Sequence, residues 1–301
     1  MSYTIETKNL CFSFNSKQQI LKNISLHVPK GSIFGFLGQN GAGKSTTMRL
    51  LAGLIYDGTD SIYLFEKKQK KQTPTVFKKI GCLIEIPILY YHLSAYDNLK
   101  YFAKLQRIPK NKIPEILEIV SLDIKSKKKV KNFSLGMKQR LAIGIALLND
   151  PELLLLDEPV NGLDPAGIIE IRNLLIKLNK EKGITIFISS HMLDEVEKMC
   201  THLGIIHHGE MVFQGTMGEF QLQNQNIQLH LEIENPKKWF SILEKEAISI
   251  YLENEKYLQC HFKSKTEIPD FIEKHTKNGM RIYQAKIQDS LEKNFMEILQ
   301  N

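Results

Sequence analysis

The hydrophobic residues follow two alternating patterns over roughly the first 220 positions of the chain. Short apolar runs bounded by glycine, proline or serine, such as GSIFGFLG (31–38), PELLLLDEP (151–159) and GITIFISS (183–190), are typical of parallel strands buried on both faces. Stretches with apolar residues at helical spacing lie between these runs, as in STTMRLLAGL (45–54). This alternation predicts an α/β domain built around a parallel sheet.

The first domain is expected to carry a helical insertion and to be followed by a second domain. Residues 93–130 have a mostly helical pattern, so we expect a helical subdomain over about residues 88–150, inside an α/β domain that covers residues 1–220. The stretch FQLQNQNIQ (220–228) is rich in amides, and we interpret it as a linker to a smaller domain, residues 221–301.

The second domain has alternating strand and helix patterns of its own. The expected elements are a strand in IQLHLEIE (227–234), a helix from near Pro236, a hairpin in ISIYLENEKYLQCHFK (248–263), a helix in IPDFIEKHTK (268–277), a strand in RIYQAKIQ (281–288) and a last helix capped near Asp289 and Ser290. The order β-α-β-β-α-β is that of a small ferredoxin-like α+β sandwich. No set of catalytic side chains gathers in this segment, which predicts an accessory domain.

The composition narrows the class of protein. The chain has 301 residues, of which 43% are hydrophobic and 24% charged, as is typical of a soluble globular protein. Its apolar runs are far shorter than the ~18 residues of a membrane span, and its start does not resemble a signal peptide, so we expect no direct membrane span. The cysteines are scattered without zinc or redox spacing, and we expect free thiols in a reducing cytosol: Cys11, Cys82, Cys200 and Cys260.

The charge gives a weaker indication of partners. The formal net charge is +7, and lysines cluster in KKQKK (67–71) and KSKKKVK (125–131). Such runs are usually solvated loops. The alternative is contact with anionic lipid headgroups, which attract each nearby lysine by about 1 kcal/mol. No aromatic or glycine-rich RNA-binding motif accompanies the lysines, so we expect no nucleic-acid partner.

A phosphate-binding loop is the strongest chemical signal. GQNGAGKST (38–46) matches the pattern G-x4-G-K-[ST] and stands between a predicted strand and a predicted helix. Its glycines allow backbone N–H groups and the helix N-terminus to face phosphate oxygens. Lys44 would pair with the β- and γ-phosphates, and the Ser45 hydroxyl would hold Mg²⁺. The expected ATP-binding residues in this loop are Gly38, Asn40, Gly41, Ala42, Gly43, Lys44, Ser45 and Thr46.

Two further buried strands end in groups suited to phosphate chemistry. Asp157 follows the run LLLL, where a carboxylate can bind Mg²⁺ through water, and Glu158 beside it can polarise the attacking water. His191 follows the strand ITIFISS, at the edge of an α/β sheet where ligands bind, so we expect it to contact the γ-phosphate.

These motifs together resemble the nucleotide-binding subunit of an ABC transporter. The likeness rests on Walker A (38–46), Walker B (153–157, followed by Glu158), the D-loop NGLD (161–164, ending at Asp164), the switch histidine His191 and FSLGM (133–137) in place of the signature LSGGQ. The resemblance implies a P-loop NTPase fold, ATP and Mg²⁺ as cofactors, and ATP hydrolysis coupled to transport.

The same resemblance implies a homodimer and gives a role to the signature. Two nucleotide-binding subunits of this family pack head to tail around two ATP molecules, so Ser134 and Gly136 would grip the γ-phosphate of the ATP held by the other subunit. Met137 completes this in-trans signature. This chain departs from the family in having Leu135 in place of a glycine and Met137 in place of glutamine. The structural alternative is an ordinary N-capped helix.

Two more site residues follow from the likeness. Phe14 is the aromatic that would stack on adenine, although Phe12 is close enough to compete. KKIGCLIEIP (78–87) occupies the Q-loop, and there Glu85 replaces the usual glutamine. A carboxylate at this position would bind Mg²⁺ or orient water more strongly than an amide. The alternative is a shifted register with Glu85 as a surface residue.

One subfamily resembles the chain in particular. The combination of LIE (83–85), SLGMKQR (134–140) and DEPVNGLDP (157–165) is similar to subunits of the bacitracin and lantibiotic self-protection exporters. The likeness implies a separate integral membrane permease, a peptide-antibiotic cargo and a peripheral location on the cytoplasmic side of the membrane. Part of IPILYYHLSAYDNL (86–99) would then form a docking surface for the permease.

Other functions remain open from the sequence. A soluble ABC ATPase that acts on ribosomes or nucleic acid is the main alternative, but such relatives usually carry two cassettes or long coiled coils, and this chain has one P-loop. The cargo could also be a lipid or another drug. A binding module that barely hydrolyses ATP is disfavoured by Glu158.

Overall fold

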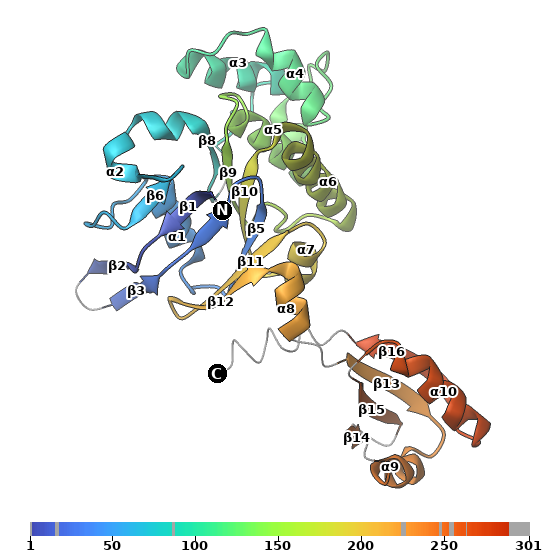
Figure 1. The fold of residues 1–301 in the computed structure, drawn as a ribbon. Helices are drawn as coiled ribbons and strands as arrows, with labels where there is room; N and C mark the ends of the chain where they lie inside the picture. The colour runs from blue at the N-terminus through green and yellow to red at the C-terminus, as the bar shows by residue number, and fades with distance from the viewer. Residues whose placement is uncertain are drawn as a thin grey trace. The chain divides into compact units, whose positions relative to one another are not determined.

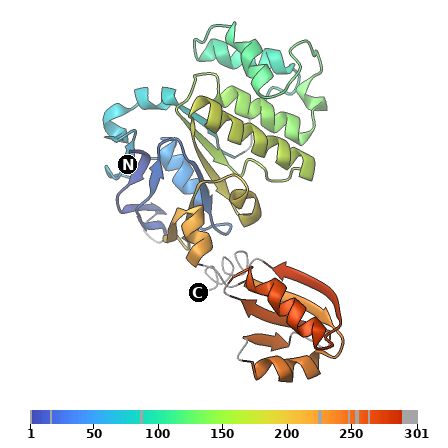
Figure 2. The same cartoon turned by 45° about the vertical axis from the view of Figure 1, so that its right-hand side comes forward.

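The computed structural model describes residues 2–15, 18–85, 88–223, 227–246, 249–252, 256–262 and 264–288. Contacts within the chain divide it into two compact units, Met1–Met217 and Gly218–Asn301 (Figure 1, Figure 2).

A six-stranded sheet forms the centre of the first unit. Five of its strands are parallel, and β12 lies antiparallel at one edge. The strands, in sheet order, are β12 (Glu210–Thr216), β11 (His202–His207), β5 (Ile33–Leu37), β10 (Thr185–Ser190), β9 (Leu153–Asp157) and β8 (Ile80–Leu83). Every residue of β5, β9 and β10 is buried, which explains their continuous apolar runs.

Both faces of this sheet are covered. On one face α1 (Lys44–Leu51) packs through Met48 against Phe34, Leu155 and other strand residues, together with two small antiparallel sheets. Those sheets are β4–β1–β6–β7 (His27–Pro29, Tyr3–Thr7, Ile62–Leu64, Lys67–Lys68) and the pair β2 and β3 (Leu10–Asn15, Gln18–Ile24). The other face is covered by α5 (Leu135–Ala146), α6 (Pro165–Lys182) and α7 (Leu193–Glu197) (Figure 1).

Helices gather at one end of the first unit (Figure 1). Here α3 (Ala95–Leu105) and α4 (Lys112–Ile119) pack on α5. Gly144 permits a close approach of α5 to α4, since a Cβ at this position would lie 3.2 Å from Ile116. The remaining short helices are α2 (Gln69–Gln72) and two 3-10 helices, Thr75–Lys79 and Val130–Asn132.

The second unit begins within α8 (Met217–Gln223). Its further elements are β13 (Ile227–Ile233), α9 (Pro236–Glu244), β14 (Ile250–Leu252), β15 (Tyr257–Phe262), α10 (Glu267–Lys277) and β16 (Ile282–Gln288). The order β-α-β-β-α-β confirms the expected one, and the sheet is antiparallel in the order β14–β15–β13–β16. Its core contains Leu231, Trp239, Leu258 and Phe271. The helix expected near Asp289 lies outside the described residues.

The stretch interpreted as a linker (220–228) contains regular secondary structure, which differs from the expectation. Its first residues complete α8 and its last residues begin β13. Phe220 is fully buried, so an apolar side chain of this amide-rich stretch packs in the interior and supports a helix.

Candidate active site

The loop between β5 and α1 has the backbone that the phosphate motif requires. Gly41 and Gly43 have φ values of 84° and 112°, in the left-handed region that favours glycine. Space is also restricted, because a Cβ on Gly43 would lie 2.6 Å from Leu21 and one on Gly38 would lie 2.4 Å from the Ile206 carbonyl oxygen. No side chain caps the N-terminus of α1. Its first N–H groups are thus directed at the place where an anion would bind.

Lys44 brings a positive charge to this loop. Its side chain is only 6% exposed. The ammonium group donates to the carbonyl oxygens of Gly38 at 2.7 Å and Gln39 at 3.3 Å, and it lies 3.5 Å from Oε1 of Glu158. A buried ammonium with backbone acceptors and a carboxylate beside it is well placed to exchange those partners for phosphate oxygens.

The acidic pair stands at the carboxyl end of β9. Asp157 is buried, and Oδ1 of its carboxylate accepts a hydrogen bond from the Ser189 hydroxyl. Glu158 has a positive φ of 48°, and its N–H donates to Oγ of the same serine at 2.9 Å. Sequence patterns do not single out Ser189. The signal that identifies it is the register of β9 and β10, which pairs Ser189 with Asp157.

His191 completes the group. Its Nδ1 lies 2.9 Å from Oε2 of Glu158. The structure therefore brings together Lys44, Glu158 and His191, which come from three separate motifs of the sequence. One carboxylate lies between a lysine ammonium and a histidine ring, at the edge of the sheet where parallel strands end.

The signature residues lie at a helix start. Ser134 is the N-cap of α5, and its Oγ accepts a hydrogen bond from the Met137 N–H at 3.2 Å. Beside it, Gly136 faces open space, since a Cβ there would find no atom closer than 3.9 Å. Asp164 likewise caps α6 and accepts from the Gly167 N–H at 3.1 Å. Among the described residues, no hydrogen bond joins these caps to Lys44 or Glu158, so the structure does not bring them into the same cluster.

Comparisons with known proteins agree with this geometry. The sequence profile of the ABC transporter family matches residues 21–161. The bacitracin transport ATP-binding protein BcrA of Bacillus licheniformis is 46% identical over 237 residues, which cover 75% of this chain and 77% of that protein. The chain belongs to the ABC transporter ATP-binding proteins. The resemblance seen in the sequence is thus confirmed, and the chain is an ATPase that binds ATP.

Further relatives support the family and the fold. The lantibiotic transport ATP-binding protein SrtF of Streptococcus pyogenes is 44% identical over 210 residues, covering 70% of this chain and 90% of that protein. The solved structure of cbiO1 from Clostridium perfringens, part of the ABC transporter complex cbiONQ, has a TM-score of 0.67 and 29% identity, covering 73% of this chain and 90% of that chain. Within the described residues of this ABC ATPase, no helix is long and apolar enough to cross a bilayer.

Glu85 has a different partner from the one expected. It has a positive φ of 63°, and its carboxylate forms an ion pair with Arg49 in the last turn of α1. In this arrangement the Glu85 side chain is half exposed. Its role as a ligand of Mg²⁺ stays a prediction, and it requires the carboxylate to leave Arg49.

The two candidate aromatics of this ABC ATPase differ in exposure. Phe14 is 60% exposed, whereas Phe12 packs against the core of the first unit. The rings meet edge to face, with centroids 4.9 Å apart. Because the Phe14 ring is largely exposed, stacking on adenine stays a prediction for Phe14, with Phe12 as its support.

The donor set suits Mg²⁺ only together with a nucleotide. Across the described ranges, no group of three or more His, Cys, Asp or Glu side chains could hold a metal by itself. The available protein ligands are the half-buried Ser45 hydroxyl and the Asp157 carboxylate, whose Oδ1 is already engaged by Ser189. Magnesium typically takes one or two protein ligands, phosphate oxygens and water, so these residues fit that ion.

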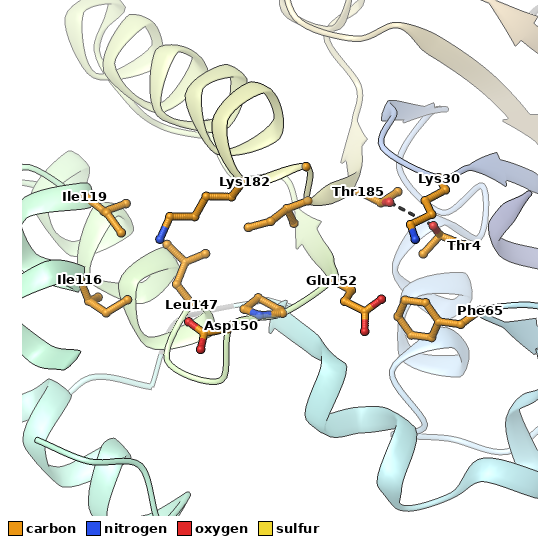
Figure 3. A pocket seen from close by; sticks show the side chains of 13 residues that line it. Thr4, Lys30, Phe65, Ile116, Ile119, Leu147, Asp150, Glu152, Lys182 and Thr185 are labelled. Carbon is orange, nitrogen blue, oxygen red and sulfur yellow. Dashed lines mark hydrogen bonds between the residues drawn. The ribbon is translucent and has the colours of Figure 1, made fainter. Parts of the chain in front are cut away.

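A separate cleft of about 470 Å³ lies at the opposite end of the central strands (Figure 3). Glu152, just before β9, and Thr185, the first residue of β10, line it together with Ile116 of α4. Its acidic groups are paired with lysines, Glu152 with Lys79 at 2.7 Å and Asp150 with Lys112. The glycine loop and the acidic pair do not contribute to this cleft, so it is distinct from the ATP site.

Proposed function

We propose that this ABC ATPase drives the export of a peptide antibiotic of the bacitracin or lantibiotic kind through a separate membrane subunit. The single observation that carries the catalytic part is the contact of Glu158 with both Lys44 and His191. The cargo is supported by relatives named for bacitracin and lantibiotic transport at 43–46% identity. The same relatives favour a transporter over the alternative of a ribosome-associated ATPase.

Each site residue has a step in hydrolysis. Backbone N–H groups of residues 41–46 and the Lys44 ammonium would bind the phosphates, while Ser45 and Asp157 would hold Mg²⁺, which neutralises phosphate charge when bound. Glu158 would accept the proton of the attacking water as the new bond to the γ-phosphorus forms and the bond to ADP breaks. His191 would orient Glu158 and contact the γ-phosphate.

The contacts of Glu158 also suggest how ATP prepares the site. Oε1 of Glu158 lies 3.5 Å from the buried Lys44 ammonium. A γ-phosphate carries more negative charge than a carboxylate and would attract Lys44 to itself. Glu158 would then be released from Lys44 and available to bind the attacking water.

A homodimer would complete the site. The Ser134 oxygen accepts from the Met137 N–H, which leaves its O–H as a donor group, and Gly136 leaves the start of α5 open. The exposed N-terminus of α5 can therefore accept the γ-phosphate of an ATP held by a second copy of the chain.

An exposed aromatic cluster fits a membrane subunit. Ile88 is 80% exposed, and Tyr91 is exposed nearby, whereas Leu89 is buried and belongs to the core. Tyr90 and Tyr101 pack edge to face with centroids 4.6 Å apart. We take this cluster as the docking surface for a cytoplasmic helix of the permease, which would hold the ATPase at the cytoplasmic side of the membrane.

We also propose that the two parts of the chain have different roles. Residues 1–220 would be the nucleotide-binding domain, with its helical subdomain over about residues 88–150, and residues 221–301 an accessory domain.

The cargo can be tested in cells. The chain is first purified from membranes, and the hydrophobic protein that accompanies it is identified. Strains lacking the genes of the ATPase and of this partner are then compared with strains that carry the partner together with wild-type or Glu158→Gln ATPase. We expect loss of tolerance to bacitracin or lantibiotics in the deletion and the Glu158→Gln strains, with unchanged tolerance to unrelated antibiotics. Equal tolerance of all strains to every peptide, or a partner without membrane spans, would contradict the proposal.

A further inference from the structure

Ser189 is a buried polar residue that contacts both acidic residues of the proposed site. Its side chain is fully buried at the carboxyl end of β10, one strand away from β9. The parallel register places it directly beside Asp157. This hydroxyl group therefore lies at the carboxyl ends of the two strands, beside the proposed catalytic residues.

The hydroxyl uses both of its hydrogen-bonding capacities. It donates its proton to Oδ1 of Asp157, and its oxygen accepts the Glu158 N–H at 2.9 Å. An alanine could do neither. The Glu158 N–H is part-buried, and the oxygen of the fully buried Ser189 is its acceptor.

The hydrogen bond from the Glu158 N–H to Ser189 supports an unusual backbone conformation of Glu158. Its φ of 48° is a conformation that non-glycine residues adopt rarely, and such a conformation persists only when the surroundings hold it. The direction of the Glu158 side chain follows from this backbone, and so do its contacts with Lys44 and His191. The same hydroxyl group holds the Asp157 carboxylate through Oδ1 and does not engage Oδ2.

We propose that Ser189 is a positioning residue, which orients Asp157 for the metal and Glu158 for the attacking water by holding both through one hydroxyl group. This inference rests on the catalytic roles proposed for Asp157 and Glu158. Ser189 itself touches neither water nor nucleotide in this scheme.

The test compares Ser189→Ala with a matched change on the same strand. Thr185→Val removes another buried hydroxyl of β10, which accepts the Gly31 N–H at 2.9 Å and pairs with Thr4 at 3.0 Å (Figure 3). Both variants lose a buried hydroxyl and its bond to a backbone N–H, but only Ser189→Ala affects the acidic pair. Ser189→Thr keeps a hydroxyl and serves as the rescue.

We expect Ser189→Ala to lower kcat for ATP by about 10²-fold, the usual effect of misplacing catalytic groups, with KM for ATP changed far less. It should also require more Mg²⁺ for half-maximal turnover, since Asp157 is no longer held. Thr185→Val should keep wild-type kcat at a similar melting temperature, and Ser189→Thr should recover part of the lost kcat. If Ser189→Ala does not fold, Ser189→Cys offers a weaker hydrogen-bonding group of similar shape for the same comparison.

A double-mutant cycle separates this inference from the proposed function. In a Glu158→Gln background, adding Ser189→Ala should reduce turnover little further, because the group that it positions is already gone. Three results would overturn the role of Ser189: a kcat within about twofold of wild type, an equal loss in Thr185→Val, or effects of Ser189→Ala and Glu158→Gln that multiply. Near-normal turnover of Glu158→Gln alone would instead overturn the role of Glu158.

Discussion

Replacing Glu158 by glutamine changes one oxygen to an amide nitrogen at the centre of the site. The shape is kept, and the remaining amide oxygen can still accept from Lys44, which now lies 3.5 Å from the carboxylate. The amide cannot take the proton of the attacking water. Loss of a general base typically lowers turnover 10²–10⁴-fold, which corresponds to about 2.7–5.5 kcal/mol of transition-state stabilisation.

Binding should respond in the opposite direction. Without the carboxylate charge, a γ-phosphate competes for Lys44 only with a neutral amide and meets less like charge, so Glu158→Gln should bind ATP at least as tightly as the wild type and accumulate as a nucleotide-bound dimer. The assays are phosphate release, titration with a fluorescent ATP analogue, and size-exclusion chromatography with ATP. A variant that still hydrolyses ATP at a near-normal rate would refute the reasoning from the Lys44–Glu158–His191 contacts.

Three further predictions address the dimer, the membrane contact and the Q-loop. A dimer pairing one Ser134→Arg subunit with one Lys44→Ala subunit should retain at most one intact site and about half of the wild-type turnover or less, and unaffected turnover in Ser134→Arg alone would argue against composite sites. Tyr91→Asp should abolish membrane association but keep ATP binding in solution, whereas loss of both would indicate misfolding. Glu85→Ala should weaken antibiotic tolerance and stimulation by the partner far more than ATP binding, while Glu85→Gln should keep ATP binding. Wild-type tolerance in Glu85→Ala would remove its role in coupling, and equal defects in Arg49→Gln would assign the effect to the ion pair.

The sequence predicts those parts of the fold that depend on local signals. The glycine loop between β5 and α1, the strand before Asp157 and the order of elements in the second unit each follow from patterns within a few consecutive residues. Such patterns combine composition, periodicity and turn residues, and all of these are visible without the fold.

Contacts between distant segments could not be predicted in this way. Ser189 meets Asp157 because of the register between β9 and β10, and nothing in either strand alone fixes that register. The ion pair of Glu85 with Arg49 joins the end of α1 to a loop that follows β8. The choice between Phe12 and Phe14 similarly needed the burial of each ring.

The hydrogen bond that caps α5 restricts which residues could replace Ser134. Its oxygen accepts from the Met137 N–H, so the start of the helix and the proposed contact with a partner's ATP share one side chain. Aspartate caps a helix as well as serine does but would bring a negative charge toward a triphosphate, and alanine offers no acceptor. Asparagine satisfies the cap without charge, and threonine adds a methyl group to the same hydroxyl. More residues at this position should therefore allow the chain to fold than allow it to hydrolyse ATP. Hydroxyl-bearing residues should allow both.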